Sequence, residues 1–249
     1  SFTMGTSNAG FTVPGSDNVR EVYRYVAGAT GKFTLFDNRW SWNAYYQHGT
    51  AKVHAALTNT WNIQRMALAQ DAVFAPAGNS AGLAAGTIVC RSTLADPSNG
   101  CVPIDRLGTA GPSAEALAYI YGEQPYRDET IKQDVAAFSL SGELFALPGG
   151  ALAIAFGGEH RKEQISGFVE EQFQPVVNAN GTTTSRWLYG NYLPNEGHYT
   201  VKEAFLEIDA PLLPGFNINA AGRYTDYSTS GSVQTWKVGG TYTPIPDIK

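Results

Sequence analysis

The sequence predicts an all-β chain, folded as an antiparallel up-and-down meander of about seven strands joined by unequal loops. Gly, Pro, Asn and Asp divide the chain into segments of roughly 12 to 18 residues. The segments are joined alternately by very short and very long connections. Most segments alternate apolar and polar residues with period two, as a half-exposed strand does. Together these observations favour consecutive hairpins over a layered or helical fold.

Seven strands are expected, and their ranges are 19–33, 39–57, 129–145, 151–168, 199–212, 216–228 and 232–243. Most of these exceed the usual length of a strand in a soluble protein. Short turns are expected at 34–39, 146–150 and 212–215, the last two with the Pro-Gly chemistry of tight turns. Long loops are expected at about 58–129 and 170–198.

The alternation assigns side chains to two faces of the predicted sheet. The segment 216–225 is clearest, because Ile218 and Tyr224 lie on one face and Asn217, Asn219 and Arg223 on the other. An apolar face is expected to carry Ile154, Phe156, Leu206, Ile208, Ile218 and Tyr224. The opposite, polar face is expected to carry Glu159, Arg161, Glu203, Glu207, Asn217, Asn219 and Arg223.

The first long loop is expected to be ordered. Residues 60–74 place Ile63, Met66, Ala67 and Gln70 at helical spacing, and Ser113 is a suitable N-cap for a short helix through Tyr121. Cys90 and Cys101 lie eleven positions apart in the same loop, without a third Cys or a nearby His for a metal site. A structural disulfide in an oxidising compartment is therefore expected, and redox activity is disfavoured because the CxxC pattern is missing.

Composition excludes several classes of function. The 249 residues carry 17 Lys and Arg against 22 Asp and Glu, a net charge of −5, so nucleic acid is an unsuitable partner. No run approaches the roughly 18 to 20 apolar residues of a membrane helix, and the mean hydropathy is −0.20. Neither measure detects a membrane β-barrel, because its alternating strands average to nearly neutral hydropathy. Aromatic residues near strand ends, among them Trp40, Trp236 and Tyr242, suit the interfacial girdles of such a barrel.

Candidate chemistry is sparse. Glu159, Arg161 and Glu163 alternate along one strand, and the expectation is charged residues paired across strands rather than an acid–base pair. The four histidines are scattered without the spacing of metal ligands. Gly157 and Gly158 match no phosphate loop and are interpreted as thin strand positions. No catalytic residue, metal site or cofactor is assigned.

Four aromatic residues of the second long loop are candidate ligand contacts: Phe173, Trp187, Tyr189 and Tyr192. Aromatic rings stack on sugars and on chelate rings. Interfacial anchoring and packing within the loop explain the same residues equally well.

Several long stretches resemble the barrel of TonB-dependent outer-membrane receptors, in the large receptor set of sphingomonad-like and related proteobacteria. The resemblance is carried by WSWNAYYQHG at 40–49, IVCRSTLADPSNGCVP at 88–103, FGGEHRKEQISGF at 156–168, NYLPNEGHYTVKEAFLEIDAPLLPG at 191–215 and GRYTDYSTSGSVQTWKVGGTYTPIPDIK at 222–249. These stretches span most of the chain in family order.

The resemblance implies that residues 1–249 are a fragment of one receptor β-barrel domain, a partial transmembrane barrel with long extracellular loops that contain short helices. The plug and the C-terminal strands are expected to lie outside it. Such receptors take up an iron chelate, cobalamin or a glycan without covalent chemistry. The implied partners are the nutrient, the receptor's own plug, the inner-membrane TonB complex and outer-membrane lipid, and the polar face would line the lumen.

Two alternatives remain open from the sequence: a soluble secreted all-β carbohydrate-binding module or hydrolase, and an adhesive surface β-protein without a plug. The faces separate the soluble module from the transporter. A sandwich would cover Ile154, Leu206 and Ile218 with a second sheet of the same chain, whereas a barrel would expose them to lipid.

Overall fold

The computed structural model describes residues 10–107 and 110–244, which form two compact units. The strand unit comprises Glu21–Lys52, Thr130–Ser166 and Glu196–Lys249. The loop unit comprises Ser1–Arg20, Val53–Glu129 and Gly167–Asn195. Several strands continue from one unit into the other. Among the described residues, no helix is long and apolar enough to cross a membrane.

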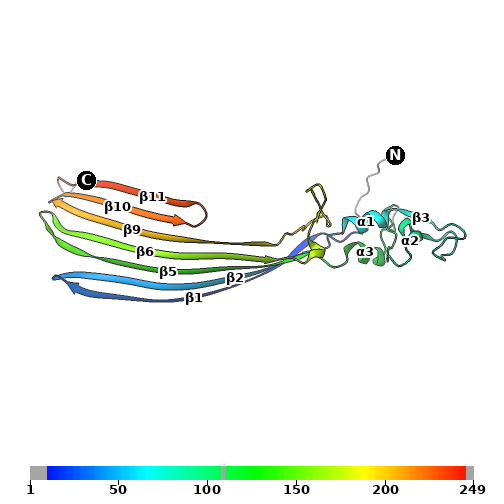
Figure 1. Cartoon of the computed structure of the whole chain (residues 1–249), viewed down its shortest axis with the longest axis horizontal. Coiled ribbons are helices and arrows are strands. Elements are labelled where there is room, and N and C mark those ends of the chain that lie inside the picture. The colour runs from blue at the N-terminus through cyan, green and yellow to red at the C-terminus, as the bar shows by residue number, and fades with distance from the viewer. Residues whose placement is uncertain (1–9, 108–109, 245–249) are drawn as a thin grey trace. The chain divides into compact units, whose positions relative to one another are not determined.

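Seven long strands form one sheet, in the order β1-β2-β5-β6-β9-β10-β11 (Figure 1). Their bounds are β1 Gly15–Leu35, β2 Asn38–Thr58, β5 Tyr126–Leu147, β6 Gly150–Phe168, β9 Asn195–Leu213, β10 Phe216–Tyr227 and β11 Gly231–Tyr242. Neighbours in the sheet follow one another along the chain, so the antiparallel meander and all seven expected strands are confirmed. The sheet is open in this chain, with β1 and β11 at its edges.

The three short turns lie where the sequence placed them. Phe36 and Asp37 join β1 to β2 with φ of 51° and 63°, the pair of positive values that a type I′ hairpin requires. Gly215 joins β9 to β10 with φ of 77°, and its carbonyl accepts a hydrogen bond from the Thr243 amide at 2.6 Å. Because such turns match the right-handed twist of strands, they hold each hairpin in register.

The strand registers confirm that the predicted residues share faces. Ile218 pairs with Ala210, and Ala220 pairs with Ile208 on one side and Val238 on the other. On the opposite face, Asn219 pairs with Asp209 and Gly239. Directly paired residues point to the same side of a sheet, so an apolar face and a polar face run across β9, β10 and β11.

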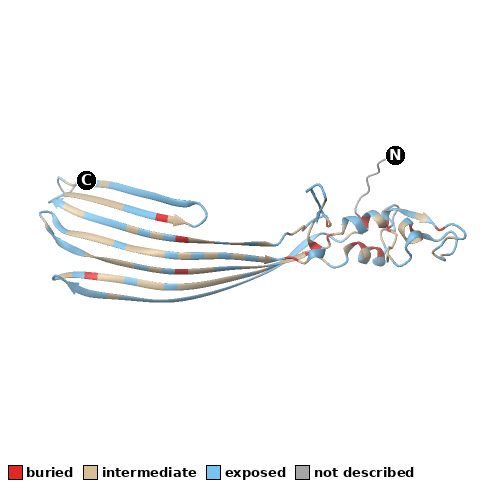
Figure 2. Cartoon of the chain, in the orientation of Figure 1, coloured by how far each residue is buried: buried red, intermediate tan, exposed pale blue. Residues whose placement is uncertain are grey.

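The apolar face is not covered by a second sheet within the described part of the strand unit. Leu206, Ile208 and Tyr224 are 44%, 37% and 45% exposed, and Trp236 is 81% exposed. Figure 2 shows these strands mainly exposed or intermediate, with only isolated buried positions. A two-sheet sandwich would have buried the same residues under a second sheet of this chain. The exposed apolar face therefore agrees with a barrel wall rather than a sandwich.

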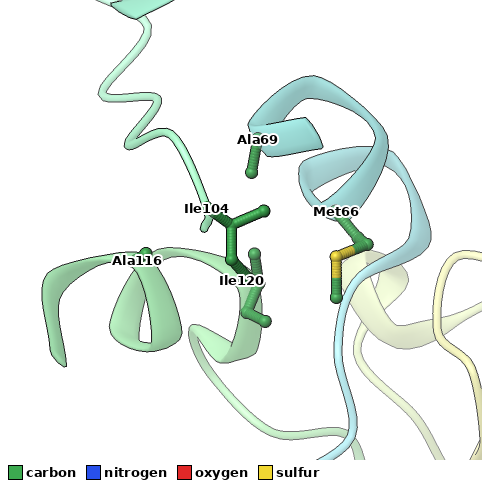
Figure 3. Close-up of a cluster of buried hydrophobic side chains, with 5 residues drawn as sticks. All are labelled: Met66, Ala69, Ile104, Ala116 and Ile120. Atoms are coloured by element: carbon green, nitrogen blue, oxygen red, sulfur yellow. The ribbon is translucent and has the colours of Figure 1, made fainter. Parts of the chain in front are cut away.

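The loop unit contains three short helices: α1 Ile63–Gln70, α2 Arg91–Ala95 and α3 Ala114–Tyr121. The side chain of Asn62 caps α1 by accepting from the Arg65 amide, and Ser113 caps α3 by accepting from the Ala116 amide. α1 and α3 pack through a small core of Met66, Ala69, Ile104, Ala116 and Ile120 (Figure 3). The expectation of an ordered loop is thus confirmed.

The expected helix at 60–74 is shorter than its periodicity suggested. α1 ends at Gln70, and Ala72–Phe74 forms β3, which pairs with β4, Ile88–Cys90. The Arg91 amide donates to the Asp71 carbonyl at 2.8 Å, and the Arg91 guanidinium contacts the Asp71 carboxylate at 3.1 Å. These contacts give the chain after Gln70 a strand partner, which a local helical pattern cannot foresee.

A second, smaller core lies in the loop unit among segments that follow the strands. It contains Val169, Phe173 and Trp187, with Tyr126 and Tyr192 packed against it. The 3₁₀ helix η1, Glu171–Phe173, and a short hairpin of β7 Val176–Val177 with β8 Thr183–Thr184 belong to the same loop.

Candidate functional site

A chain of hydrogen bonds crosses five strands on the polar face of the strand unit. Arg24 on β1 donates to Gln47 on β2 at 2.9 Å, and Gln47 donates to Gln133 on β5 at 2.9 Å. Gln133 in turn donates to Glu163 on β6 at 3.0 Å, and Tyr199 on β9 is hydrogen-bonded to the same carboxylate. Polar side chains that link so many strands indicate a sheet face that contacts water or other polar groups.

Glu159, Arg161 and Glu163 follow one another on the same face of β6. The Arg161 guanidinium lies 3.8 Å from the Glu159 carboxylate and 3.5 Å from the Glu163 carboxylate. The expected pairing across strands is therefore wrong for this arginine, because both of its ion-pair partners lie on its own strand, two positions before it and two positions after it. The single positive charge of the guanidinium offsets part of the negative charge of the two carboxylates, as expected for a charged surface rather than an isolated acid–base pair.

The polar face continues over β9 and β10. The Arg223 guanidinium lies 3.4 Å from the Glu203 carboxylate, which also accepts from the Thr225 hydroxyl at 3.1 Å. The Asn217 amide donates to Asp209 at 2.9 Å. Phe205 lies between Glu203 and Glu207 in sequence, and its ring occupies the space that a Cβ on Gly157 would meet. Gly157 lies on the same side of β6 as Glu159 and Arg161, and Phe205 lies on the same side of β9 as Glu203 and Glu207. The predicted polar residues of β6, β9 and β10 therefore share one face of the sheet.

A hollow of about 550 Å³ lies on the strand unit near its short turns. The predicted residues Glu207 and Asn219 line it. Further charged residues around it are Lys32, Arg39, Glu143, Asp209 and Lys237. The sequence analysis did not single out these five, although the same period-two alternation places Asp209 and Lys237 on the polar face. The mixed charges suit contacts with a polar protein surface better than the binding of one ionic ligand.

In the loop unit, the four candidate aromatic contacts separate into buried and accessible residues. Phe173 and Trp187 are 2% and 4% exposed, and their ring centroids lie 6.2 Å apart. Tyr192 is half-buried beneath the Arg127 guanidinium, which lies 5.4 Å from the ring centroid. Tyr189 is 55% exposed, and its amide donates to the Thr60 hydroxyl at 3.1 Å. The structure thus brings three of the rings together in a core and leaves Tyr189 accessible.

A polar hollow of about 530 Å³ lies beside this core, lined by Phe168, Glu170, Glu171, Gln172 and Arg186. The Tyr126 hydroxyl donates to the Glu170 carboxylate at 2.5 Å, and the Gln172 amide donates to it at 2.7 Å. These two hydrogen bonds hold the pKa of Glu170 below its ordinary value, with the tyrosine as the larger cause. The sequence analysis missed this hollow, because its residues carry no recognisable motif.

Comparison with known proteins decides the family. The family described as TonB dependent receptor-like, beta-barrel matches residues 1–249. The chain belongs to this family. No curated protein and no solved structure matches it. Members of the family are receptors and transporters of the bacterial outer membrane rather than enzymes, and they work with a ligand, a plug and TonB. The finer assignment to a sphingomonad-like group stays a prediction.

The receptor's disulfide pairs Cys90 with Cys101, as the sequence analysis predicted. Their Cα atoms lie 6.1 Å apart, within the usual range for a disulfide. Cys90 is buried, and its neighbour Val89 on β4 pairs with Val73 on β3. The bond therefore ties the β3–β4 hairpin to the segment that runs into the α1–α3 core at Ile104.

Two histidines of the receptor sit beside single carboxylates. His48 is hydrogen-bonded to Asp134 at 2.7 Å, and His54 to Asp128 at 2.6 Å. Over residues 10–107 and 110–244, no three His, Cys, Asp or Glu side chains gather as a metal site would require. Both pairs are therefore interpreted as cross-strand hydrogen bonds between β2 and β5.

Proposed function

We propose that this chain forms part of the wall of an outer-membrane receptor, which binds a scarce nutrient and releases it inward through a gated lumen. The observation that carries the proposal is the pair of opposite sheet faces. One face exposes apolar side chains such as Leu206 and Trp236, and the other joins polar side chains into a chain across five strands. A sheet with these faces suits lipid on one side and water on the other.

The polar face is assigned to the lumen in this proposal. Its predicted members are Glu159, Arg161, Glu203, Glu207, Asn217, Asn219 and Arg223. Exposed ion pairs such as Arg223 with Glu203 are compatible with water but costly against hydrocarbon. The plug would contact this face, and the mixed charges around the hollow at Glu207 offer it exchangeable ion pairs. Contacts of that kind can be broken when TonB pulls on the plug, whereas a large apolar interface would resist.

Ligand capture is assigned to the loop unit. Of the four aromatic candidates there, Tyr189 is the most accessible, and it is suited to stacking on a sugar or on the ring of a chelate. Phe173 and Trp187 would act indirectly, because their packing holds the segment that presents Tyr189. Tyr192 would be held in place by its contact with Arg127. The receptor performs no covalent chemistry in this proposal, and its residues bind, orient and release the nutrient.

Uptake by cells that express the full-length receptor tests the proposal. Three labelled probes represent the three nutrient classes: a ferric siderophore, cobalamin and an oligosaccharide. We expect one probe to accumulate in cells with TonB and to remain at background when TonB is deleted. Accumulation of no probe, or equal accumulation without TonB, would contradict the proposal.

Binding at the loop unit has its own test. Tyr189→Ala should weaken binding of the transported probe about 3- to 10-fold, the range expected for one aromatic contact. Phe74→Ala is the matched control, because Phe74 is another exposed aromatic residue of the loop unit, 72% accessible on the β3–β4 hairpin. Binding that falls equally in both variants, or in neither, would contradict the role of Tyr189.

The soluble carbohydrate-binding module or hydrolase receives no support. Its apolar face would have to pack against a second sheet, and the described strands of the strand unit form a single one. Its catalytic carboxylates would have to be free, whereas Glu159 and Glu163 both contact Arg161. An adhesive β-protein shares the barrel, and TonB-dependent uptake distinguishes the receptor from it.

A further inference from the structure

An aliphatic row crosses five strands on the polar face of the strand unit. Its members, one from each strand, are Val22 on β1, Ala51 on β2, Ile131 on β5, Ile165 on β6 and Gly197 on β9. Each shares its parity with the member of the hydrogen-bonded chain on its strand, so each points to the same face. Val22 and Ile131 are 74% and 39% exposed. The proposed transport function does not use this row.

Contacts across β5, β6 and β9 show that this part of the row is continuous. Gln133 on β5 bonds to Glu163 on β6. In an antiparallel pair, the residues two positions beyond such a contact, Ile131 and Ile165, lie opposite each other. The Cγ2 atom of Ile165 lies 3.8 Å from the position that a Cβ on Gly197 would take. Because Gly197 carries no side chain, it leaves the flank of Ile165 open.

The row continues onto β2 and β1. His48 is hydrogen-bonded to Asp134 across β2 and β5. Three positions further along, the same antiparallel register sets Ala51 opposite Ile131. A two-residue turn joins β1 to β2, and counting back from it sets Val22 opposite Ala51. An apolar strip of side chains therefore runs across the sheet on the face that is otherwise polar.

A guanidinium stands beside the β1 end of the row. Arg24 lies two positions from Val22 on the same side of β1. Its Nε and Nη2 groups both donate to the side-chain oxygen of Gln47, the former at 2.9 Å. Among the described residues, no carboxylate lies at ion-pair distance from Arg24. Gln47 thus holds one edge of the guanidinium and leaves its Nη1 end for a ligand.

The polar face of β1 and β2 is basic. Over residues 21–35 and 38–52, the charged side chains that parity places on this face are Arg24, Lys32 and Arg39. Glu21 is the acidic residue of these two ranges, and it has the opposite parity. The carboxylates of the polar face lie on later strands, such as Glu163 on β6 and Glu203 on β9. An anion at this face is therefore attracted towards β1 and β2.

We propose that the aliphatic row and Arg24 together bind an amphipathic anion, whose apolar ring or chain lies on the row and whose carboxylate meets Arg24. A guanidinium pairs with a carboxylate through two parallel hydrogen bonds. Aliphatic side chains remove an apolar group from water, whereas a sugar would lose hydrogen bonds to water against them. The inference rests on the proposed transport function. It narrows the nutrient to a ferric chelate that carries an apolar group and a free carboxylate, rather than a glycan.

Binding of a small probe to the full-length receptor in lipid nanodiscs tests the proposal. The probe is phenylbutanoate, its neutral counterpart is phenylbutanamide, and saturation-transfer NMR titrations give both affinities. We expect the carboxylate to bind at least about tenfold more tightly than the amide, the usual gain from a charge-assisted pair. Arg24→Gln should remove most of this preference. Ile131→Asn with Ile165→Asn should weaken both probes about 3- to 10-fold, because both carry the same phenyl group.

Two matched controls change the same kinds of residue away from the row. Lys132→Gln removes a positive charge next to Ile131 in sequence but on the opposite face of β5. Val233→Asn changes an aliphatic residue of the polar face, 48% exposed on β11 and paired with Thr225. Both controls should keep the affinity for phenylbutanoate within about twofold.

The outcomes separate this inference from the transport function. Equal affinity for the two probes, no binding of either, an unchanged preference in Arg24→Gln, or an equal loss in a control would each overturn the inference. If the double Asn variant does not fold, the comparison of the two probes on Arg24→Gln still decides. TonB-dependent uptake without a preference for the carboxylate would refute this inference alone, and the preference without uptake would refute the transport function alone.

Discussion

The strand unit and the loop unit are stabilised in different ways. In the loop unit, Ala69, Ala116, Ile120 and Cys90 are fully buried, and Phe173 is 2% exposed. In the strand unit, the buried residues Trp40, Val135, Val201 and Thr225 are isolated, while large residues such as Trp236 and Val238 are exposed. The loop unit therefore excludes water with its own side chains, as a soluble domain does. The strand unit relies on backbone pairing, and in the proposed function lipid removes its apolar face from water.

The largest expected effect lies in the core of the loop unit. Phe173→Ala removes a ring that contacts both Tyr126 and Trp187, with centroids 5.3 and 6.2 Å away. We expect a loss of about 3 to 5 kcal/mol in the local stability of this segment, the usual cost of emptying an aromatic core position. Amide hydrogen exchange in the full-length receptor measures it. Unchanged protection of residues near Trp187 would show that the loop does not depend on a core of its own.

Arginine on the apolar face tests the strand unit. Ile218→Arg should lower the folding free energy by about 1 kcal/mol, because it places a guanidinium on the apolar face only three positions from the turn at Gly215, where the cost of a charge is smaller than at the midplane. The control is Asn219→Arg, one residue along β10 and on the polar face, which should cost far less. Equilibrium refolding into lipid vesicles gives both values. Equal costs for the two variants would contradict the assignment of lipid and lumen faces.

Opening the disulfide tests whether the loop unit depends on its covalent closure. Cys90→Ala with Cys101→Ala should destabilise the loop unit by about 3 kcal/mol in the chain-entropy model for a short loop. The strand unit should keep its resistance to denaturant, since the bond closes only a segment within the loop unit. Protease cleavage restricted to the loops of the double variant is the expected observation. Cleavage within the seven strands would show that the two units unfold together.

A smaller effect is expected at the cap of α3. The Ser113 hydroxyl accepts the Ala116 amide at 3.1 Å, and removing it by Ser113→Ala should cost about 1 kcal/mol. Ser113→Asp is the matched control, because aspartate is an equally good cap and should keep the helix. Hydrogen exchange of residues 114–121 compares the three proteins. An effect of Ser113→Asp as large as that of Ser113→Ala would rule out capping as the cause.

The smallest effect concerns pH. Because the pKa of Glu170 is lowered in the folded protein, its hydrogen bonds contribute stability above the ordinary pKa of a glutamate. This contribution should disappear as the pH falls through the lowered pKa, when the carboxylate takes up a proton. Tyr126→Phe removes the main cause and should flatten the acid dependence of local exchange around residue 170. An unchanged acid dependence in this variant would exclude the Tyr126 hydrogen bond as the source.

Local pattern by itself determined the strand framework of this protein. Alternation of residues such as Asn217, Ile218 and Asn219 assigned two faces, and turn residues such as Gly215 marked the hairpins. These features were predictable because a side chain's direction on a strand depends only on its position in sequence. The spacing of Cys90 and Cys101 and the capping residue Ser113 were recognisable for the same reason. Each depends on neighbours a few residues away.

Tertiary contacts decided the rest. The Asp71 and Arg91 contacts end α1 and turn Ala72–Phe74 into a strand, although the local pattern suited a longer helix. Burial separated Phe173 and Trp187 from Tyr189, which had looked alike as loop aromatics. The contact of Tyr126 with Glu170 and the hydrogen bond from Gln133 to Glu163 join segments far apart in the chain. Sequence spacing carries no information about such neighbours, because only the packed chain brings them together.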